Sequence, residues 1–302
     1  MEREYGVAYS PLLPHASKST KSAFTPYITA KPNRRVVLDT LALLKRAAIV
    51  SSPMELSVLD AKLSQLNALR PLDASSVRAL RSVFESFETE LIATSNQIEG
   101  NTLTIRETAM VIEKGMTISG KPLKDHIEAL NHKAALDFIK QAAASRDAIT
   151  QKETLRIHEL ILTRLDDEWA GRYRNVPVRI VGSSHLPPNA MKVPDLMDAW
   201  EQSTLENWGA THPVLLAADL HATLAGIHPF IDGNGRTSRL VMNLTLLRHG
   251  WPVVIIPSES ALRLAYYQAL EDTQTGKQSN AFREFICLRV DDMLNRYLDA
   301  LK

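Results

Sequence analysis

"HPFIDGNGRTSR", residues 228–239, decides the local fold, because it marks the end of one helix and the start of the next. A residue that precedes proline avoids the α conformation, so the helix ahead of Pro229 should end at His228. Gly233 and Gly235 permit positive φ and a close approach of a ligand to the backbone. Apolar residues then recur at helical spacing, which predicts a second helix from about Gly235. The stretch is therefore a turn that leads into a helix N-terminus.

The same turn gathers groups that bind phosphate. Free N–H groups and the helix dipole make a helix N-terminus an anion site. Arg236 and Arg239 share one face of the new helix, where each opposes the dipole at a cost of roughly 0.3–1 kcal/mol. That cost is explained if both arginines bind phosphates. Asp232 is a carboxylate of the kind that holds Mg²⁺ (or Mn²⁺) together with phosphate oxygens. His228 could take a proton from an attacking hydroxyl. These groups suit attack on a nucleotide phosphate, without a P-loop motif.

Composition sets the class of protein. The 302 residues suit one large domain or a core with a smaller extension. A net charge of +1 gives no bulk attraction for nucleic acid or an anionic membrane. The single cysteine, Cys287, excludes a disulfide within the chain. No apolar run approaches the length of a membrane span, and the N-terminus lacks a secretory signal. We therefore expect a soluble cytoplasmic protein.

Helical periodicity dominates the chain. We expect an extended arm over residues 1–35, a short helical extension over 36–72, a long helix within 73–101 and a core over 102–302. Residues 173–190 alternate between apolar and polar positions instead, which predicts a short β-hairpin or flap. The fold class is therefore all-α with one small β element. The predicted helices cover 36–50, 54–69, 76–100, 104–115, 121–143, 150–165, 193–208, 212–227, 236–250, 260–273 and 280–302.

The pattern H-x-F-x-D-G-N-G-R-x-x-R in residues 228–239 resembles the signature of Fic-domain proteins, with no departure. Members of that family transfer AMP from ATP to a hydroxyl side chain of a target protein and release pyrophosphate. The resemblance implies a helical bundle of the Fic fold, with 102–302 as its catalytic core. It also implies one role for each matched residue: His228 as general base, Asp232 as Mg²⁺ ligand, Asn234 with the backbone of Gly233 to Gly235 as phosphate cradle, Arg236 on the β-phosphate and Arg239 on the γ-phosphate.

A second motif, "SNQIEGN" at residues 95–101, lies far upstream. Its helix should end at Gly100, which places Glu99 in the last turn, where the helix dipole disfavours a carboxylate and a cation should compensate it. The motif resembles the inhibitory helix of many Fic proteins, in which a Ser or Thr, here Ser95, lies four residues before the glutamate. In that family the glutamate pairs with the second arginine of the signature. The resemblance therefore implies an inhibitory pair between Glu99 and Arg239.

Four more stretches resemble one subgroup, the animal Fic AMP-transferases that act on an endoplasmic-reticulum chaperone and their bacterial relatives. They are "EGNTLT" at 99–104, "GRYR" at 171–174, "HLPP" at 185–188 and "YYQALE" at 266–271.

This likeness implies that Tyr267 stacks on adenine and that Leu123 lies in a homodimer contact. It implies an Hsp70-type chaperone as a candidate target. Gln274 stands near the position of the subgroup's adenine-side asparagine, which leaves the choice of base open. The flap would align the target by main-chain pairing, and the residues that would do so are Val178, Ile180, Val181 and Gly182.

Other functions remain open on the same residues. In this subgroup the glutamate can position a water that removes AMP from a modified protein, so a deAMPylase is an alternative. A catalytically silent nucleotide-sensing module is a second alternative, although it would not need a base at His228. A zinc hydrolase is excluded, because the nine histidines form no HExxH motif and Cys287 is alone. His221, seven residues before His228, is expected to pack in the core.

Overall fold

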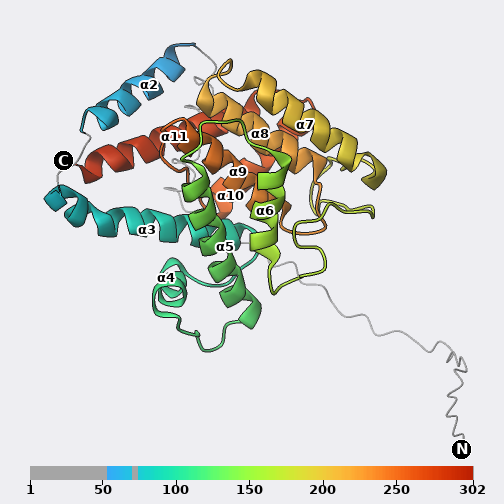
Figure 1. Ribbon diagram of the computed structural model, residues 1–302, viewed down its shortest axis with the longest axis horizontal. Coiled ribbons are helices and arrows are strands. Elements are labelled where there is room, and N and C mark those ends of the chain that lie inside the picture. The colour runs from blue at the N-terminus through green and yellow to red at the C-terminus, as the bar shows by residue number, and fades with distance from the viewer. Residues whose placement is uncertain (1–52, 70–73, 302) are drawn as a thin grey trace, which may run out of the picture.

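The computed structural model describes residues 53–69 and 74–301, so the predicted arm and the predicted helix over 36–50 lie outside the described residues. Nearly all the regular structure is helical, which confirms the all-α prediction (Figure 1). In the described part of the chain, no helix is both long and apolar enough to span a membrane. The helices are α2 (Pro53–Ala68), α3 (Ala74–Ile98), α4 (Ile105–Lys114), α5 (Leu123–Ala142), α6 (Gln151–Leu162), the 3₁₀ turn η1 (Ala190–Lys192), α7 (Val193–Asn207), α8 (Pro213–Ile227), α9 (Asn234–Arg248), α10 (Ser260–Gln274) and α11 (Ala281–Ala300).

Helix α9 runs through the middle of the bundle, with α3, α5, α6 and α8 packed around it (Figure 1). Leu240 and Leu244 join a core shared with α3 and α5 to α8. Met242 and Leu246 join a second core shared with α2, α8, α10 and α11. Because apolar side chains leave α9 on both sides, the helix is buried along nearly its whole length. The bundle therefore fixes the α9 N-terminus, where the signature lies.

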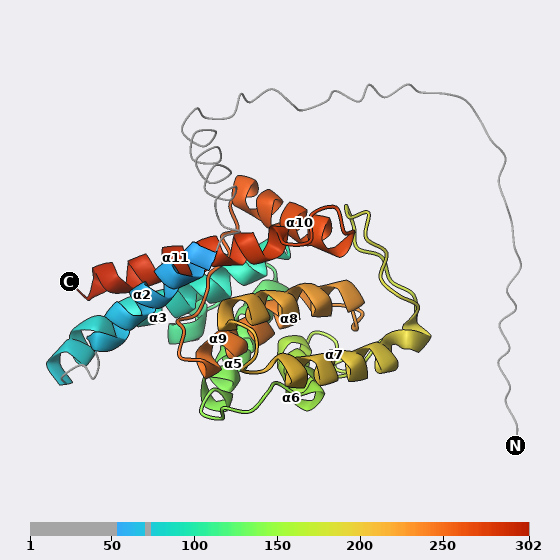
Figure 2. The ribbon, with the colours of Figure 1, turned by 90° about the horizontal axis from the view of Figure 1, so that it is seen from above.

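Helix α3 carries the second motif and lies beside α11 at one end of the bundle (Figure 2). The ring of Tyr297 in α11 contacts Phe84 and Phe87 of α3, with ring centroids 5.3 and 5.1 Å apart. An ion pair between Arg296 and Glu90 adds a polar contact between the same helices. These contacts orient α3 so that its C-terminal end reaches α9.

The local signals at helix ends give the boundaries closely. Thr150 and Glu153 form the predicted capping box at the start of α6. Helix α3 ends at Ile98, and Gly100 adopts a φ of +96°, a conformation that glycine accepts without a Cβ clash. Helix α9 begins at Asn234, one residue from the predicted start.

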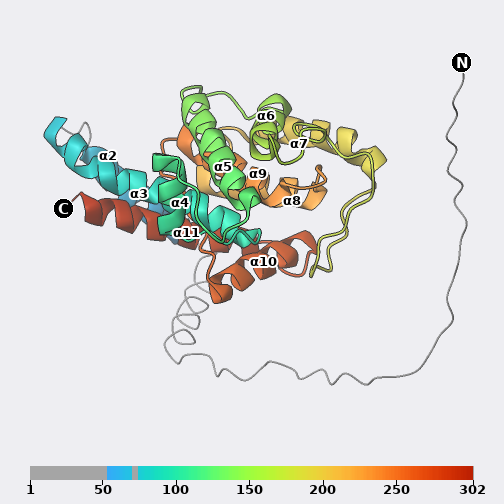
Figure 3. The same cartoon turned by 90° about the horizontal axis from the view of Figure 1, so that it is seen from below.

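The predicted β-hairpin needs a correction. Residues 174–189 run out from the bundle and back as two adjacent legs (Figures 2 and 3), but no strand forms in them. Pro177, Pro187 and Pro188 lack backbone N–H groups, which removes donors that a two-stranded ladder needs. At the tip, the backbone and hydroxyl of Ser184 donate to Glu271 of α10. The segment, called the flap below, is a loop without strand pairing, and its tip is held by the contact with α10.

Candidate active site

The candidate base stands at the C-terminal end of α8. His228 adopts a left-handed conformation, with φ 51° and ψ 57°, which is costly for a residue with a Cβ. Its Nδ1 lies 3.2 Å from the carbonyl oxygen of Ala225. A carbonyl oxygen only accepts, so Nδ1 carries the proton and Nε2 keeps a lone pair. Burial lowers the pKa of His228. The ring is therefore neutral at pH 7 and can accept a proton at Nε2.

Buried side chains hold the turn between α8 and α9. Asn234 Oδ1 accepts from the N–H of Phe230 at 3.0 Å, and Asn234 Nδ2 donates to the carbonyl of Phe230 at 2.9 Å. The Phe230 ring stacks on His158 of α6, with centroids 3.6 Å apart. His158 Nδ1 accepts from the N–H of Gly171, so His158 Nε2 donates to the carbonyl of Asp232 at 3.0 Å. The side chain of Asn234 thus fixes the turn through two contacts with the backbone of Phe230.

Asp232 presents a carboxylate at the open side of the turn, with its side chain 58% exposed. Its Oδ1 accepts from the N–H of Gly233 at 2.6 Å and lies 3.4 Å from Arg236 Nη2. Burial raises the pKa of Asp232, but Arg236 and the N–H of Gly233 outweigh burial, and the net pKa is lowered. Within residues 53–69 and 74–301, no group of three His, Cys, Asp or Glu side chains could hold a metal alone. Asp232 therefore fits Mg²⁺ only in combination with phosphate oxygens.

Arg236 lies in the first turn of α9 and is almost fully buried. Its Nη1 donates to Oε1 of Glu128, a buried carboxylate of α5, at 3.1 Å. The other carboxylate oxygen of Glu128 accepts from Asn101, just after α3. Because the guanidinium is held between Glu128 and Asp232, its direction is set before any ligand binds. It is therefore a preorganised cation at the α9 N-terminus.

Arg239 lies one turn further along α9 and contacts α3. Its Nε donates to Oγ of Ser95 at 2.8 Å, and its Nη2 donates to the carbonyl of Ser95 at 2.9 Å. The same Nη2 lies 2.8 Å from Oε1 of Glu99. The structure thus contains the Glu99–Arg239 pair that the second motif implies. Burial opposes the charge of Arg239, but Glu99 and Tyr266 outweigh burial, so the pKa of Arg239 is raised.

The carboxylate of Glu99 also lies against the start of α9. A Cβ atom added at Gly235 would clash with Oε1 of Glu99 and would lie 3.1 Å from Nη1 of Arg239. Glycine at this position therefore allows the carboxylate to approach the helix N-terminus closely. A negative charge is stable there because the first N–H groups and the dipole favour it. Glu99 occupies the place where the sequence predicts phosphate.

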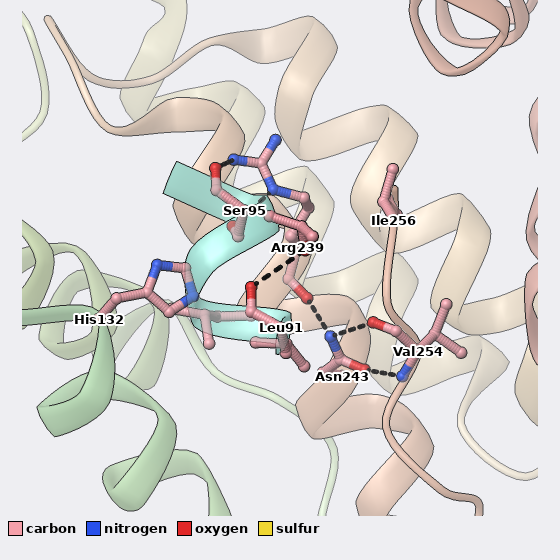
Figure 4. A pocket seen from close by; sticks show the side chains of 9 residues that line it. Leu91, Ser95, His132, Arg239, Asn243, Val254 and Ile256 are labelled. Atoms are coloured by element: carbon pink, nitrogen blue, oxygen red, sulfur yellow. Dashed lines mark hydrogen bonds between the residues drawn. The ribbon is translucent and has the colours of Figure 1, made fainter. Parts of the chain in front are cut away.

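A small cavity lies directly behind Arg239 (Figure 4). Asn243 closes one side, because its amide donates to the carbonyls of Arg239 and Val254 and accepts from the N–H of Val254. All residues that line the cavity are buried. The cavity therefore lies behind the guanidinium of Arg239 and is not a nucleotide site. The lining consists of Leu91, Thr94, Ser95, His132, Arg239, Leu240, Asn243, Val254 and Ile256.

The remaining sequence-predicted residues lie around this centre. Tyr267 is half-exposed and donates to the carbonyl of Ile98 at 3.1 Å, next to Glu99. Gln274 donates to the carbonyl of Ala222 at 3.3 Å and packs against Gly226 in α8. In the flap, Val178 and Ile180 are partly buried, whereas Val181 and Gly182 are exposed, Val181 to 99%.

Leu123 is 69% exposed at the start of α5, so it does not pack in the core. His221 is buried, as expected, and its Nε2 lies 3.1 Å from the hydroxyl of Tyr266.

Sequence reasoning missed four residues that hold the site. Arg174 belongs to the "GRYR" stretch, but only the fold shows that its side chain donates to the carbonyl of His228. His158, Glu128 and Tyr266 each contact a signature residue from another helix. Of these three residues, only Tyr266 had a sequence signal, because it is the first tyrosine of "YYQALE".

Comparisons with known proteins agree with this geometry. Residues 148–246, which include the complete signature, match the model of the Fic/DOC family. The chain is 33% identical over 293 residues to "Protein adenylyltransferase Fic" of Drosophila ananassae, across 97% of this chain and 58% of that protein. It is 36% identical over 243 residues to the protein of the same name from Drosophila grimshawi, across 80% of this chain and 48% of that protein. The chain thus spans about half the length of the curated relatives that it matches.

Solved structures share the fold. Fic-1 from C. elegans superposes with a TM-score of 0.72 at 28% identity, over 89% of this chain and 78% of that chain. A Fic domain containing signaling protein from Bacteroides thetaiotaomicron superposes with a TM-score of 0.70 at 26% identity, over 82% and 96% of the two chains. An all-α bundle with this turn and this signature defines a Fic fold. The chain is a Fic-domain protein.

Proposed function

We propose that this chain is a protein adenylyltransferase that moves AMP from ATP to a hydroxyl side chain of a target protein and is held at low activity by Glu99. Relatives that carry the name protein adenylyltransferase support the reaction. The observation that carries the regulation is the contact between Glu99, Arg239 and Gly235. One carboxylate engages both the second arginine of the signature and the helix N-terminus, and a polyphosphate needs both.

In the proposed complex, the phosphates lie over the first turn of α9. The backbone N–H groups of Gly233 to Gly235 face them, Arg236 binds the β-phosphate and Arg239 binds the γ-phosphate. Asp232 would hold Mg²⁺ together with phosphate oxygens, and the ion would offset negative charge as pyrophosphate leaves. The ring of Tyr267 would stack on adenine, and Gln274 lies further along the same helix.

The chemical step is a displacement at the α-phosphorus. The target hydroxyl oxygen forms a new bond to the α-phosphorus, and the bond from that phosphorus to the oxygen bridging to the β-phosphate breaks. The hydroxyl proton moves to Nε2 of His228, which has a lone pair because Nδ1 donates to Ala225. Pyrophosphate leaves, and His228 later loses the proton to solvent.

Inhibition follows from competition for one guanidinium. Arg239 has five N–H donors, and in this structure they face Ser95, Glu99 and Tyr266. A γ-phosphate at Arg239 would meet the carboxylate of Glu99 at close range, and the two negative charges repel. Removal of the Glu99 carboxylate would free both the guanidinium and the helix N-terminus.

An assay with two differently labelled nucleotides tests the reaction. The purified full chain is incubated with Mg²⁺ and ATP labelled either at the α- or at the γ-phosphate, with a cell lysate as the source of acceptors. Relative to lysate without the added protein, Glu99→Gly should transfer α-label strongly and no additional γ-label, wild type should transfer α-label weakly, and the double variant Glu99→Gly/His228→Ala should add neither label. Equal transfer by wild type and Glu99→Gly would overturn the inhibitory role. Transfer of γ-label would indicate a kinase reaction instead.

The identity of the acceptor protein and the direction of the reaction, AMP transfer or AMP removal, are tested in the same way. An Hsp70-type chaperone is the candidate acceptor, and addition of such a chaperone to the α-label assay tests it. A deAMPylase would release AMP from a protein that Glu99→Gly has modified, and the wild type can be offered that product. A silent nucleotide sensor would bind MgATP and transfer nothing even as Glu99→Gly.

We also propose that two copies pair through the start of α5. Leu123 supports this contact because it is a large apolar side chain exposed beside the charged Lys124. Leu123→Ser should shift the sedimentation coefficient of a dimer to that of a monomer. A chain that is monomeric with Leu123 intact would overturn the proposal.

A further inference from the structure

One buried arginine joins the candidate base to both legs of the flap. Arg174 is 2% exposed. Its Nε donates to the carbonyl of His228 at 2.7 Å. Its Nη1 donates to the carbonyl of Val176 on the outgoing leg at 3.0 Å, and its Nη2 donates to the carbonyl of Pro188 on the returning leg at 2.7 Å. The side chain therefore contacts three segments that meet at the edge of the site.

Every hydrogen bond observed for Arg174 connects it to backbone. Its Nη2 lies 3.4 Å from the carbonyl of Ile227, and its own N–H donates to the carbonyl of Pro229. Among the ion pairs of residues 53–69 and 74–301, none involves Arg174. The last carbonyls of a helix lack partners within the helix, and a cation is favourable at that end. The guanidinium thus neutralises and caps the C-terminal end of α8.

The contacts of Arg174 matter because neither the backbone at His228 nor the flap is stabilised by regular secondary structure of its own. His228 has a left-handed backbone that surrounding contacts must stabilise. The flap forms no strand ladder, so its legs have no continuous pairing with each other. A planar guanidinium with a rigid fork fixes the direction of several acceptors at once, which a flexible ammonium cannot do. Loss of the fork would loosen the link between the flap and the base, because, of the hydrogen bonds in the described part of the chain, only that between His185 and the carbonyl of Gly226 would still join the flap to the end of α8.

We propose that Arg174 is a positioning residue that couples the flap, and with it a target segment, to the ring of His228. This inference rests on the proposed transfer reaction. The target hydroxyl must come within hydrogen-bond reach of His228 Nε2, while the target chain is aligned by the flap. Arg174 sets the distance between these two elements. It touches neither ATP nor the target hydroxyl itself.

Arg174→Lys tests the coupling, and Arg248→Lys is its matched control. Arg248 is also buried and also donates to backbone carbonyls, those of Ala142 and Asp147, but these lie near the far end of α9 from the signature. Both variants lose a guanidinium fork and keep the positive charge, so both should lose stability. Only Arg174→Lys should change the flap and the base.

Two measurements need no transfer activity. Trypsin cleavage after the exposed Arg179 reports the freedom of the flap and should be roughly tenfold faster in Arg174→Lys than in wild type or Arg248→Lys. The ring C–H resonance of His228, assigned by its loss in His228→Ala, should move in Arg174→Lys alone. An unchanged cleavage rate or an unchanged resonance would overturn the coupling.

The third measurement uses the active background. In Glu99→Gly, the added Arg174→Lys change should lower the rate of AMP transfer roughly 10- to 100-fold, the effect of a small misplacement of reacting groups, with MgATP affinity unchanged. A parallel loss of MgATP affinity would assign Arg174 to nucleotide binding instead. If Glu99→Gly transfers nothing, the proposed function fails, and the cleavage and resonance measurements still decide the coupling.

Discussion

Oε1 of Glu99 lies 2.8 Å from Nη2 of Arg239, although 140 residues separate the two in the sequence. Arg239 is buried, and the side chain of Glu99 is 32% exposed at the end of α3. The charged pair therefore has solvent on one side only, where a nucleotide would approach. A contact of this kind can yield to a competing anion, because the carboxylate can turn toward water while the anion takes its place beside the buried guanidinium.

Glu99→Gln should change the preference between ATP and ADP. Gln keeps the size of the side chain and removes its charge, so the γ-phosphate gains access to Arg239. A charge-assisted hydrogen bond of this kind makes ATP bind tighter relative to ADP by roughly tenfold. Isothermal titration calorimetry with MgATP and MgADP measures the ratio of dissociation constants.

The control for this experiment is Asp219→Asn. It removes the charge and one of two acceptors from a contact of 2.7 Å with Arg283, between α8 and α11, away from the signature. Its ATP-to-ADP ratio should equal that of wild type. The same ratio in Glu99→Gln as in wild type would contradict a competition for Arg239.

Tyr266→Phe should remove one of the hydrogen bonds that hold Arg239 and should lower the stability of the fold. The Tyr266 hydroxyl accepts from Nη1 of Arg239 at 3.4 Å and donates to Nε2 of His221 at 3.1 Å. Burial holds the pKa of His221 well below its usual range, so this imidazole is neutral and accepts the proton. Phe leaves a buried acceptor without its donor, which costs roughly 1–3 kcal/mol. Urea unfolding measures this loss.

The same Tyr266→Phe change should affect catalysis. In the Glu99→Gly background, Arg239 loses one of the contacts that orient it, so AMP transfer should fall roughly 3- to 10-fold, the equivalent of one weak hydrogen bond. Transfer equal to the parent Glu99→Gly would show that Ser95 alone orients Arg239.

Sequence reasoning located the turn because its signals are local. The step from His228 to Pro229, and the two glycines, predict a helix end and a helix start within seven residues. The structure has both ends at these places. The Glu99–Arg239 contact was implied only by resemblance, because no local pattern connects residues on α3 and α9.

The missed contacts involve either backbone acceptors or distant helices. Arg174 binds carbonyl oxygens, which every residue has, so no partner can be read from the sequence. The alternation at Val176, Val178 and Ile180 is typical of a strand, but prolines on both legs prevent the ladder. Asn234 lies at the predicted place in the turn. Its side-chain amide, however, accepts from the N–H of Phe230 and donates to the carbonyl of Phe230.

Two substitutions of His158 should separate its two hydrogen bonds. Asn places an acceptor near Nδ1 and keeps the bond from the N–H of Gly171, whereas Gln places a donor near Nε2 and keeps the bond to the carbonyl of Asp232. Each variant leaves one buried group unpaired, at a cost of roughly 1–3 kcal/mol. Thermal unfolding should show comparable losses.

Transfer activity should distinguish these two variants. In the Glu99→Gly background, His158→Asn should lose more activity than His158→Gln, because only the Asn variant loses the hydrogen bond to the carbonyl of Asp232 that holds the turn. The misplaced turn should lower the transfer rate roughly 10- to 100-fold. Equal activities of the two variants would contradict a specific role for the contact with Asp232.

Buried neutral histidines should make the fold sensitive to acid. Burial holds the pKa values of His132 and His221 well below 6.5, and the charges of nearby arginines add to the effect. Below pH 6.5 the unfolded chain takes up protons at these two histidines while the folded chain does not. The free energy of unfolding therefore falls as pH drops through 6.5, by about 1.4 kcal/mol per pH unit for each histidine.

His132→Asn isolates one of these protons. Asn is neutral at every pH and places its amide near the position of Nδ1, from which His132 contacts Oδ1 of Asn96 at 3.3 Å. Urea unfolding between pH 7.5 and 5.5 should show a slope below pH 6.5 that is smaller than that of wild type by about one proton, or about 1.4 kcal/mol per pH unit. Above pH 7 both proteins should have the same slope. An identical slope below pH 6.5 would mean that His132 takes up its proton in the folded state, which would require water to reach the interior beside Arg239.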